Sequence, residues 1–378
     1  MPLALLALTI SAFAIGTTEF VIVGLIPTIG ADLGVSLPSA GLLVSLYALS
    51  VAIGAPLLTA LTGRVPRKML LAALMALFTV GNLVAWQAPG YESLIVARVL
   101  TGLAHGVFFS VGSIIATTLV PKDKAASAIA TMFSGMTVAF VAGIPLGTFI
   151  GQHFGWRATF LIVALFGLVA FLGAVAFVPR GLPQTPPAPL ARQFRVLAQP
   201  RLLLVYAMTA VGYGGSLIAF TYMAPLLEQI AGFTPSQVSL VLVGYGVSVA
   251  VGNVWGGKLA DSVGPVKALK RIFLLLAIVL LALTFTVHVK WLAVLTMLAW
   301  GAVAFGNVPG LQVYVVKQAR HFAPDATDVA SGFNIAAFNL GVAGGSSLGA
   351  FALTALSGRL DRGQGLPERT AEPVELAH

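Results

Sequence analysis

The sequence predicts an all-α integral membrane protein that is built from two related helical bundles. Apolar residues make up 58% of the 378 residues, charged residues only 9%, and the mean hydropathy is +0.98. A water-soluble domain of this length needs far more charge on its surface. Stretches of about 20 apolar residues recur along the chain, and each is long enough as a helix to cross a hydrocarbon core of about 30 Å.

An internal repeat indicates the two bundles. The segment Tyr47-Ala-Leu-Ser-Val-Ala-Ile-Gly54 aligns with Tyr245-Gly-Val-Ser-Val-Ala-Val-Gly252 when the first is shifted by 198 positions. The same shift places the basic turn that ends at Lys68 against the segment 261–264. Many secondary transporters are built from two membrane halves that meet at a central site.

Eleven membrane spans are predicted in chain order. Six precede and five follow a polar interval that is rich in proline and holds three arginines, which is typical of a solvated linker. We therefore expect an N-terminal bundle at 1–178, a linker at 179–200, a C-terminal bundle at 201–356 and a polar tail at 357–378. The spans lie near residues 3–28, 39–61, 69–88, 93–120, 127–150, 156–178, 200–226, 238–258, 266–288, 291–316 and 327–350.

The basic residues predict the orientation in the membrane. Of the 21 Lys and Arg residues, fifteen lie in alternate loops, and only Arg157 and Lys290 lie in the opposite loops. The positive-inside rule therefore places the N-terminus and the linker in the cytoplasm. This distribution explains the net charge of +9 without nucleic acid as a partner. The fifteen residues are Arg64, Arg67, Lys68, Lys122, Lys124, Arg180, Arg192, Arg195, Arg201, Lys258, Lys267, Lys270, Arg271, Lys317 and Arg320.

The second half is shorter than the first. The glycine-rich segment 143–147 is followed by a turn and a sixth span, whereas its counterpart at 344–349 is followed only by 350–356 before polar residues begin. Eleven spans would place the tail arginines outside, against the charge pattern. Two interpretations stay open: a protein of eleven spans, or a twelfth span of which about 25–30 residues were lost by natural deletion or by an error in the gene model.

Three ionisable side chains lie inside predicted spans and form a candidate proton-coupling site. Glu19 is the only charged residue among residues 10–29, where a charge costs about 2.5–3.5 kcal/mol on insertion scales. Because burial favours a neutral carboxyl group, Glu19 is a candidate proton carrier. Arg98 and His105 are seven residues apart and share one helix stripe, at depths that permit contact with Glu19. The structural alternatives are a packing role for Glu19 and His105, and for Arg98 an anchor on backbone carbonyls.

Two further sets of residues are candidates for function: one for a hinge between helices, and one for binding of the solute. Gly143, Pro145 and Gly147 permit close helix approach and a bend, either as simple packing or as a sliding hinge. Polar side chains in spans can bind a neutral, hydroxyl-rich solute, although helix-to-helix hydrogen bonds use the same groups. These substrate-binding candidates are Tyr47, Tyr213, Tyr222, Tyr245, Asn253, Asn307, Gln312, Asn334 and Asn339. Cysteine is absent, which excludes disulfides and thiolate metal sites, and we expect no metal.

The loop after the eighth span carries a family signature. Its sequence, Gly257-Lys-Leu-Ala-Asp261-Ser-Val-Gly264, resembles the Gly-x-Leu-x-Asp-x-x-Gly pattern of the major facilitator superfamily. The copy after the second span has Gly63 in place of the acid. The resemblance implies two pseudo-symmetric six-helix bundles, here with the last helix missing or truncated. It also implies a conformational latch that consists of Asp261, Gly257, Gly264, Arg64, Arg67 and Lys68.

Other segments narrow the resemblance within that family. Arg98-Val-Leu-Thr-Gly102 is similar to the buried-arginine pattern of drug/proton antiporters. Gly143-Ile-Pro145-Leu-Gly147 resembles a loosened antiporter motif, with Ile144 where the family pattern has glycine. The segments 16–20, 104–109, 134–138 and 155–157 are similar to bacterial arabinose and sugar efflux permeases, and the resemblance covers residues 5–350.

These resemblances imply a function. We expect a proton-coupled exporter of a small organic solute, sugar or drug-like, that works by alternating access in a bacterial inner membrane. Its expected partners are the solute, protons and lipid, its energy source is the proton gradient without a cofactor, and it is expected to be monomeric. The alternative is a non-transporting or degenerate protein, such as a sensor, which the incomplete twelfth span suggests. An enzyme is not expected, because metal-ligand clusters, paired catalytic carboxylates and nucleophile elbows are absent from the sequence.

Overall fold

The computed structural model describes residues 3–184, 186–221, 223 and 226–342. Every regular element in these ranges is helical, which confirms the predicted all-α fold class. The question of a twelfth span concerns residues 343 onward and lies outside the described part.

The N-terminal bundle contains the first six spans. Its first span bends through a 3-10 turn between α1 and α2, and its fifth contains a π turn, Ala139–Gly143, between α6 and α7. The π turn lies just before Pro145, whose missing N–H removes one bond of the regular helical pattern. The helices are α1 Leu3–Val21, α2 Ile26–Leu33, α3 Leu37–Leu61, α4 Arg67–Trp86, α5 Tyr91–Thr118, α6 Ala125–Val138, α7 Ile144–Phe154 and α8 Trp156–Phe177.

The linker and the C-terminal bundle follow. In the linker, α9 Leu190–Gln193 continues into a 3-10 turn, and a π turn at Leu226–Ile230 follows α10. The bundle helices are α10 Pro200–Thr221, α12 Pro235–Val263, α13 Pro265–Thr286 and α14 Lys290–Phe322. A 3-10 turn, Pro324–Ala326, then leads into a helix that starts at residue 327 and is described as far as residue 342.

The repeat in the sequence is also a repeat of helices. A shift of 198 residues places the start of α3 at Leu37 on the start of α12 at Pro235, and the start of α4 at Arg67 on that of α13 at Pro265. The packing repeats as well, because α3 lies against α5 and α12 lies against α14. The two bundles therefore share one local plan.

Most of the predicted spans correspond to a helix of sufficient length. Within the described residues, nine helical segments are long and apolar enough to cross a membrane. A tenth is obtained when Leu190–Ala198 and Pro200–Gly212, which meet at 71°, count as one span. Helix α14 continues beyond the predicted span 291–316, as far as Phe322. Its final turns carry Lys, Gln and Arg, which continue a helix readily beyond the apolar region.

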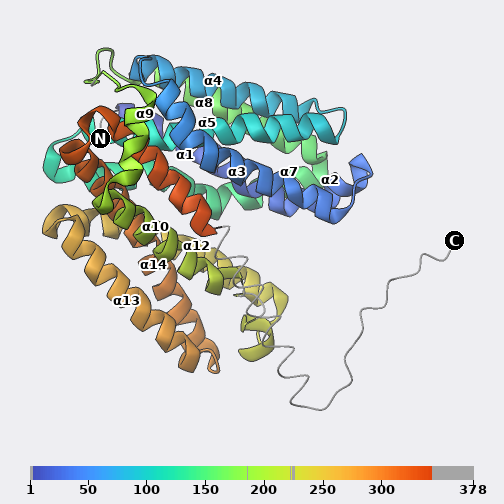
Figure 1. The fold of residues 1–378 in the computed structure, drawn as a ribbon. Helices are drawn as coiled ribbons and strands as arrows, with labels where there is room; N and C mark the ends of the chain where they lie inside the picture. Colours follow the sequence, from blue (N-terminus) through green and yellow to red (C-terminus); the bar gives the residue numbers. More distant parts are fainter. Residues whose placement is uncertain (1–2, 185, 222, 224–225, 343–378) are drawn as a thin grey trace.

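The bundles meet at the end where the basic loops lie. We call this the basic end; it comprises the turns at 62–66, 119–124, 264 and 323–326 together with the linker. Figure 1 shows the N-terminal bundle in blue to green, the C-terminal bundle in yellow-green to orange, and the helix from residue 327 in red between them. Helix α12 packs directly against α6, so these two helices join the halves.

Candidate functional site

A cluster of buried polar side chains crosses four helices of the N-terminal bundle. We call it the polar cluster: Thr18 and Glu19 from α1, Tyr47 from α3, Asn82 from α4, and Arg98 and His105 from α5. All are buried except Glu19, whose side chain retains 17% exposure. Polar groups at this depth are costly unless they are paired or functional.

The structure brings Glu19 and His105 close together. The Nδ1 atom of His105 lies 2.9 Å from the hydroxyl of Tyr47 and 3.7 Å from Oε2 of Glu19. The first distance is a hydrogen bond, whereas the second is too long for one. Oε2 of Glu19 is buried and has no hydrogen-bond partner among the described residues. A small movement of either side chain would therefore exchange one partner of His105 for the other.

Arg98 bonds to backbone carbonyls of two neighbouring helices. Its Nη1 donates to the carbonyl of Thr18 at 2.8 Å and its Nε to that of Leu43 at 3.3 Å. Its guanidinium also lies 4.1 Å from the centre of the Tyr47 ring. Among the described residues Arg98 forms no ion pair. These two bonds are those expected of a backbone anchor, and Glu19 is not bonded to Arg98. A proton-coupling role for Arg98 stays a prediction.

Sequence reasoning missed Asn82. Its Oδ1 accepts a 2.7 Å hydrogen bond from Thr18, and its Nδ2 donates to the carbonyl of Phe78 within α4. The side chain of Asn82 therefore holds Thr18, the residue that precedes Glu19 in α1. Its signal was present, since Asn82 is a lone amide in an apolar span.

The acidic half of the predicted latch binds the opposite bundle. Both carboxylate oxygens of Asp261 accept backbone N–H groups at the start of α6, from Ala126 and Ser127, each at 2.8 Å. Gly257 makes this approach possible, because an added Cβ would lie 2.6 Å from the Cβ of Ala130. Gly264 has a φ of +83°, which glycine adopts readily, and separates α12 from α13.

The basic half of the predicted latch uses a different acid. Gly63 supplies no carboxylate, but Arg67 forms a 3.1 Å ion pair with Asp328, at the start of the helix from residue 327. Sequence reasoning missed Asp328, although a charged residue at the start of a span was visible. In the described part of the chain, neither Arg64 nor Lys68 forms an ion pair.

Further bonds at the basic end join the two halves around Asp328. Ser110 of α5 donates to the carbonyl of Asp328 at 2.8 Å, and Ser331 donates to the carbonyl of Ser110 at 2.8 Å. Arg320 of α14 donates to Thr117 of α5 at 3.1 Å. A pocket of about 540 Å³ lies in this region, lined by both halves and by the linker. The molecule is therefore held together at its basic end.

The predicted hinge residues pack against α1. Gly143 faces Thr17 so closely that an added Cβ would collide with its hydroxyl, and a Cβ on Gly147 would lie 2.5 Å from Val21. Pro145 itself is exposed. The glycines thus allow the π turn and α7 to lie against the first span. Sliding along this contact stays a prediction.

Two of the predicted substrate-binding amides form a network within the C-terminal half. Nδ2 of Asn334 donates to Oε1 of Gln312 at 2.7 Å, and Thr209 of α10 donates to Oδ1 of Asn334 at 2.7 Å. Gln312 donates in turn to Ser331. This chain connects α10, α14 and the helix from residue 327, so the same groups serve helix association.

The remaining polar candidates are dispersed. Asn253 donates across the bundle interface to the carbonyl of Ala130 at 2.7 Å, and Tyr245 packs on Trp300 with ring centres 5.3 Å apart. Asn307 and Asn339 each donate to a carbonyl of their own helix. Tyr222 and the side chain of Tyr213 lie outside the described residues. Apart from Tyr47, these candidates do not join the polar cluster.

The fold and the buried polar groups define the class of protein. Two repeated helical bundles that span a membrane and meet across an interface are the architecture of a multi-pass secondary transporter. The model of the Major Facilitator Superfamily matches residues 8–350, and the chain belongs to that family. Its members are transporters and not enzymes. The predicted resemblance is thereby confirmed.

Known relatives and a solved structure agree with this assignment. The uncharacterized MFS-type transporter YtbD of Bacillus subtilis is 50% identical over 92% of this chain and 87% of its own. The putative transporter AraJ of Escherichia coli is 31% identical over 94% and 89%, and a chloramphenicol resistance protein of Streptomyces lividans is 34% identical over 95% and 91%. The fold is similar to the E. coli fucose:proton symporter FucP, with a TM-score of 0.71, 14% identity and coverage of 95% and 92%.

Proposed function

We propose that this protein is a proton-coupled exporter of a small organic solute, of the sugar or drug-like class, in a bacterial inner membrane. The observation that carries the proposal is the geometry around Glu19, whose buried Oε2 lies 3.7 Å from His105 and has no hydrogen-bond partner in the described part of the chain. A proton on Glu19 or on His105 would supply the missing bond between them. Export is supported by the relative that is named for chloramphenicol resistance.

Each member of the cluster has a distinct role in the proposal. Glu19 carries the proton, because it is the one acid of the cluster and it retains partial exposure. His105 is its partner, and Tyr47 holds the histidine when Glu19 does not. Arg98 positions Glu19 indirectly by fixing the carbonyl of Thr18, the preceding residue. A proton arriving at Glu19 would therefore change the contacts between α1, α3 and α5.

The bonds at the basic end complete the cycle. Asp261 and the Arg67–Asp328 ion pair hold the halves together in the described arrangement. In alternating access, the solute site opens to one side when the contacts on that side break. The proposal therefore assigns to the basic end the contacts that must be released once in each transport cycle.

The direct test is Glu19→Gln, measured in proteoliposomes with an imposed pH gradient and radiolabelled chloramphenicol and arabinose as probes. We expect pH-driven transport to fall at least about tenfold, while exchange without a gradient persists, because glutamine keeps the shape and cannot release a proton. Glu92→Gln, which changes an exposed acid at the start of α5, is the matched control and should transport normally.

The outcomes separate the possible functions. Unchanged pH-driven transport in Glu19→Gln would refute the role of Glu19. If the unmodified protein binds a probe but does not exchange it in counterflow, the protein is a sensor or a degenerate relative. Exchange that never responds to the pH gradient would identify a facilitator without proton coupling.

A further inference from the structure

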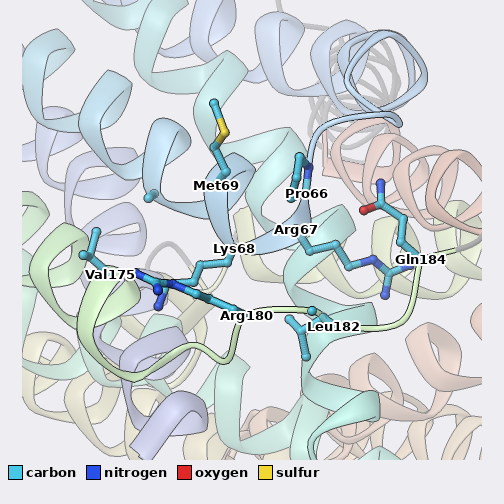
Figure 2. Close-up of a pocket in the computed structure, with 10 residues that line it drawn as sticks. Pro66, Arg67, Lys68, Met69, Val175, Arg180, Leu182 and Gln184 are labelled. Carbon is cyan, nitrogen blue, oxygen red and sulfur yellow. The ribbon is translucent and has the colours of Figure 1, made fainter.

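A basic groove lies at the side of the N-terminal bundle, away from the polar cluster. It has a volume of about 350 Å³ and lies at the basic end, between the start of α4 and the segment that follows α8. Lys68 and Met69 line it from α4, Val175 from α8, and Arg180 and Leu182 from the linker. Figure 2 shows the side chains of Lys68 and Arg180 extending toward Val175, whereas Arg67 extends toward Gln184.

The charge of the groove is not balanced by the residues that the structure describes. Three of its lining residues are basic, Arg67, Lys68 and Arg180, and none is acidic. Lys68 and Arg180 form no ion pair with any described residue. Arg67 pairs with Asp328 through Nη2, but its Nε is buried and has no hydrogen-bond partner within the described ranges. The groove therefore favours an anion, and the positive end of the α4 helix dipole adds to this preference.

The same groove is apolar on the side of the transmembrane segments. Met69 is 65% exposed and Val175 is 45% exposed, and the exposed face of α8 continues with Leu172 and Leu168. In a membrane protein such a face contacts acyl chains. An occupant that satisfies both parts of the groove carries a negative head group and a hydrocarbon tail. A free phosphate ion would leave the apolar wall without a partner.

We propose that this groove binds a phospholipid with an anionic head group. Lys68 and Arg180 bind the phosphate, and an acyl chain lies along Met69 and Val175. Basic pockets between transmembrane helices at the membrane surface are suited to this class of lipid. The lipid would also lie against Arg67, the residue that joins the two halves through Asp328.

The test compares two double variants of the full-length protein in detergent, titrated with dioleoylphosphatidylglycerol and followed by native mass spectrometry. Lys68→Gln/Arg180→Gln should weaken binding at least about tenfold, since each basic group near an anionic lipid contributes measurably. Arg195→Gln/Lys270→Gln removes the same charge from exposed positions that do not line the groove, and should bind as the unmodified protein does. Arg180→Gln alone, at an exposed linker position, should weaken binding without any effect on folding.

Three results would overturn the proposal. The first is equal binding of phosphatidylglycerol by both double variants. The second is equal affinity of the unmodified protein for dioleoylphosphatidylcholine, which would leave only an apolar contact. The third is full displacement of the lipid by millimolar inorganic phosphate, which would identify a site for the free ion.

Discussion

The carboxyl group of Glu19 and the hydroxyl of Tyr47 both lie near Nδ1 of His105, which is hydrogen-bonded to only one of them. His105 is bonded to Tyr47, and Glu19 lies just beyond bonding distance. In the proposed mechanism these three side chains respond to the arrival of one proton, because each protonation state satisfies a different pair of atoms. Two donors of the neighbouring Arg98, Nε and Nη1, bond to backbone carbonyls, whereas its buried Nη2 has no hydrogen-bond partner among the described residues.

The first prediction at the residue scale concerns Tyr47. Tyr47→Phe removes the 2.9 Å hydrogen bond to Nδ1 of His105, and should lower the free energy of unfolding by about 1–3 kcal/mol. Tyr206→Phe is the matched control, because the buried hydroxyl of Tyr206 has no partner among the residues described, and its removal should be neutral or stabilising. Denaturant unfolding of the two variants measures the difference; equal losses would contradict the assigned bond.

Arg98 gives a second prediction at this scale. Arg98→Lys retains the charge but cannot reach the carbonyls of Thr18 and Leu43 together, so we expect a loss of about 2 kcal/mol or more. Arg157→Lys at the opposite end also loses a carbonyl contact, but that side chain is partly exposed and should cost less than about 1 kcal/mol. Thermal unfolding of both variants tests which substitution costs more stability. A smaller loss for Arg98→Lys than for Arg157→Lys would exclude an anchoring role.

Glu19, Arg98 and His105 could be singled out from the sequence, but the individual bonds that each one forms could not be predicted. Glu19, Arg98 and His105 are conspicuous because ionisable groups are rare inside apolar spans. Helical spacing gives depth along each span, but not how α1 and α5 are rotated toward one another. The expected contact of Arg98 with Glu19 therefore became a bond to the backbone of Thr18, and Asn82 was overlooked.

The fifth span, α6 with the π turn and α7, shows how an element is shaped by its neighbour. Pro145 could be predicted to bend this span, because proline lacks a donor. The location of the π turn at Ala139–Gly143 could not, since it depends on the contact of Gly143 with Thr17 on α1. Helix starts that follow proline or a capping serine, such as those of α3 and α4, were predictable within about two residues.

A prediction at the element scale follows from this contact. Gly143→Ala should destabilise the protein by about 1–3 kcal/mol, because the new methyl group meets the hydroxyl of Thr17. Thr17→Ala in the same chain removes that hydroxyl and should restore most of the loss. Denaturant unfolding of the two single variants and the double variant measures the coupling. Simple additivity would show that α1 and the π turn do not meet as described.

At the scale of the whole molecule, the two copies of the repeat join the bundles through different kinds of bond. In one copy a carboxylate, Asp261, binds the start of α6. In the other the corresponding position is Gly63, and a side-chain pair, Arg67 with Asp328, lies nearby. The repeat and the loss of the acid were visible in the sequence. The replacement was not, because Asp328 is distant in the chain and belongs to no signature.

The prediction for the whole molecule concerns opening at the basic end. Because the chain contains no cysteine, Thr59→Cys places a unique thiol in the pocket of about 540 Å³ between the halves. Adding Asp261→Asn or Asp328→Asn should raise the rate at which maleimide labels this thiol about tenfold. Each substitution weakens a charge-assisted bond that contributes about 1.5–3 kcal/mol to keeping the pocket closed. Asp123→Asn, at an exposed position nearby, should leave the rate unchanged. Equal rates in all variants would mean that these bonds do not hold the halves together.

The two ways of joining the bundles also predict different patterns of evolutionary drift. Asp261 binds peptide N–H groups, which every residue except proline provides, so position 127 can change its side chain without losing the bond. Arg67 and Asp328 bind side chain to side chain, so a change in one is tolerated only with a compensating change in the other. Among descendants of this sequence, the contact of Asp261 with α6 should persist through one invariant acid. The contact of Arg67 with Asp328 should persist through two positions that mutate together.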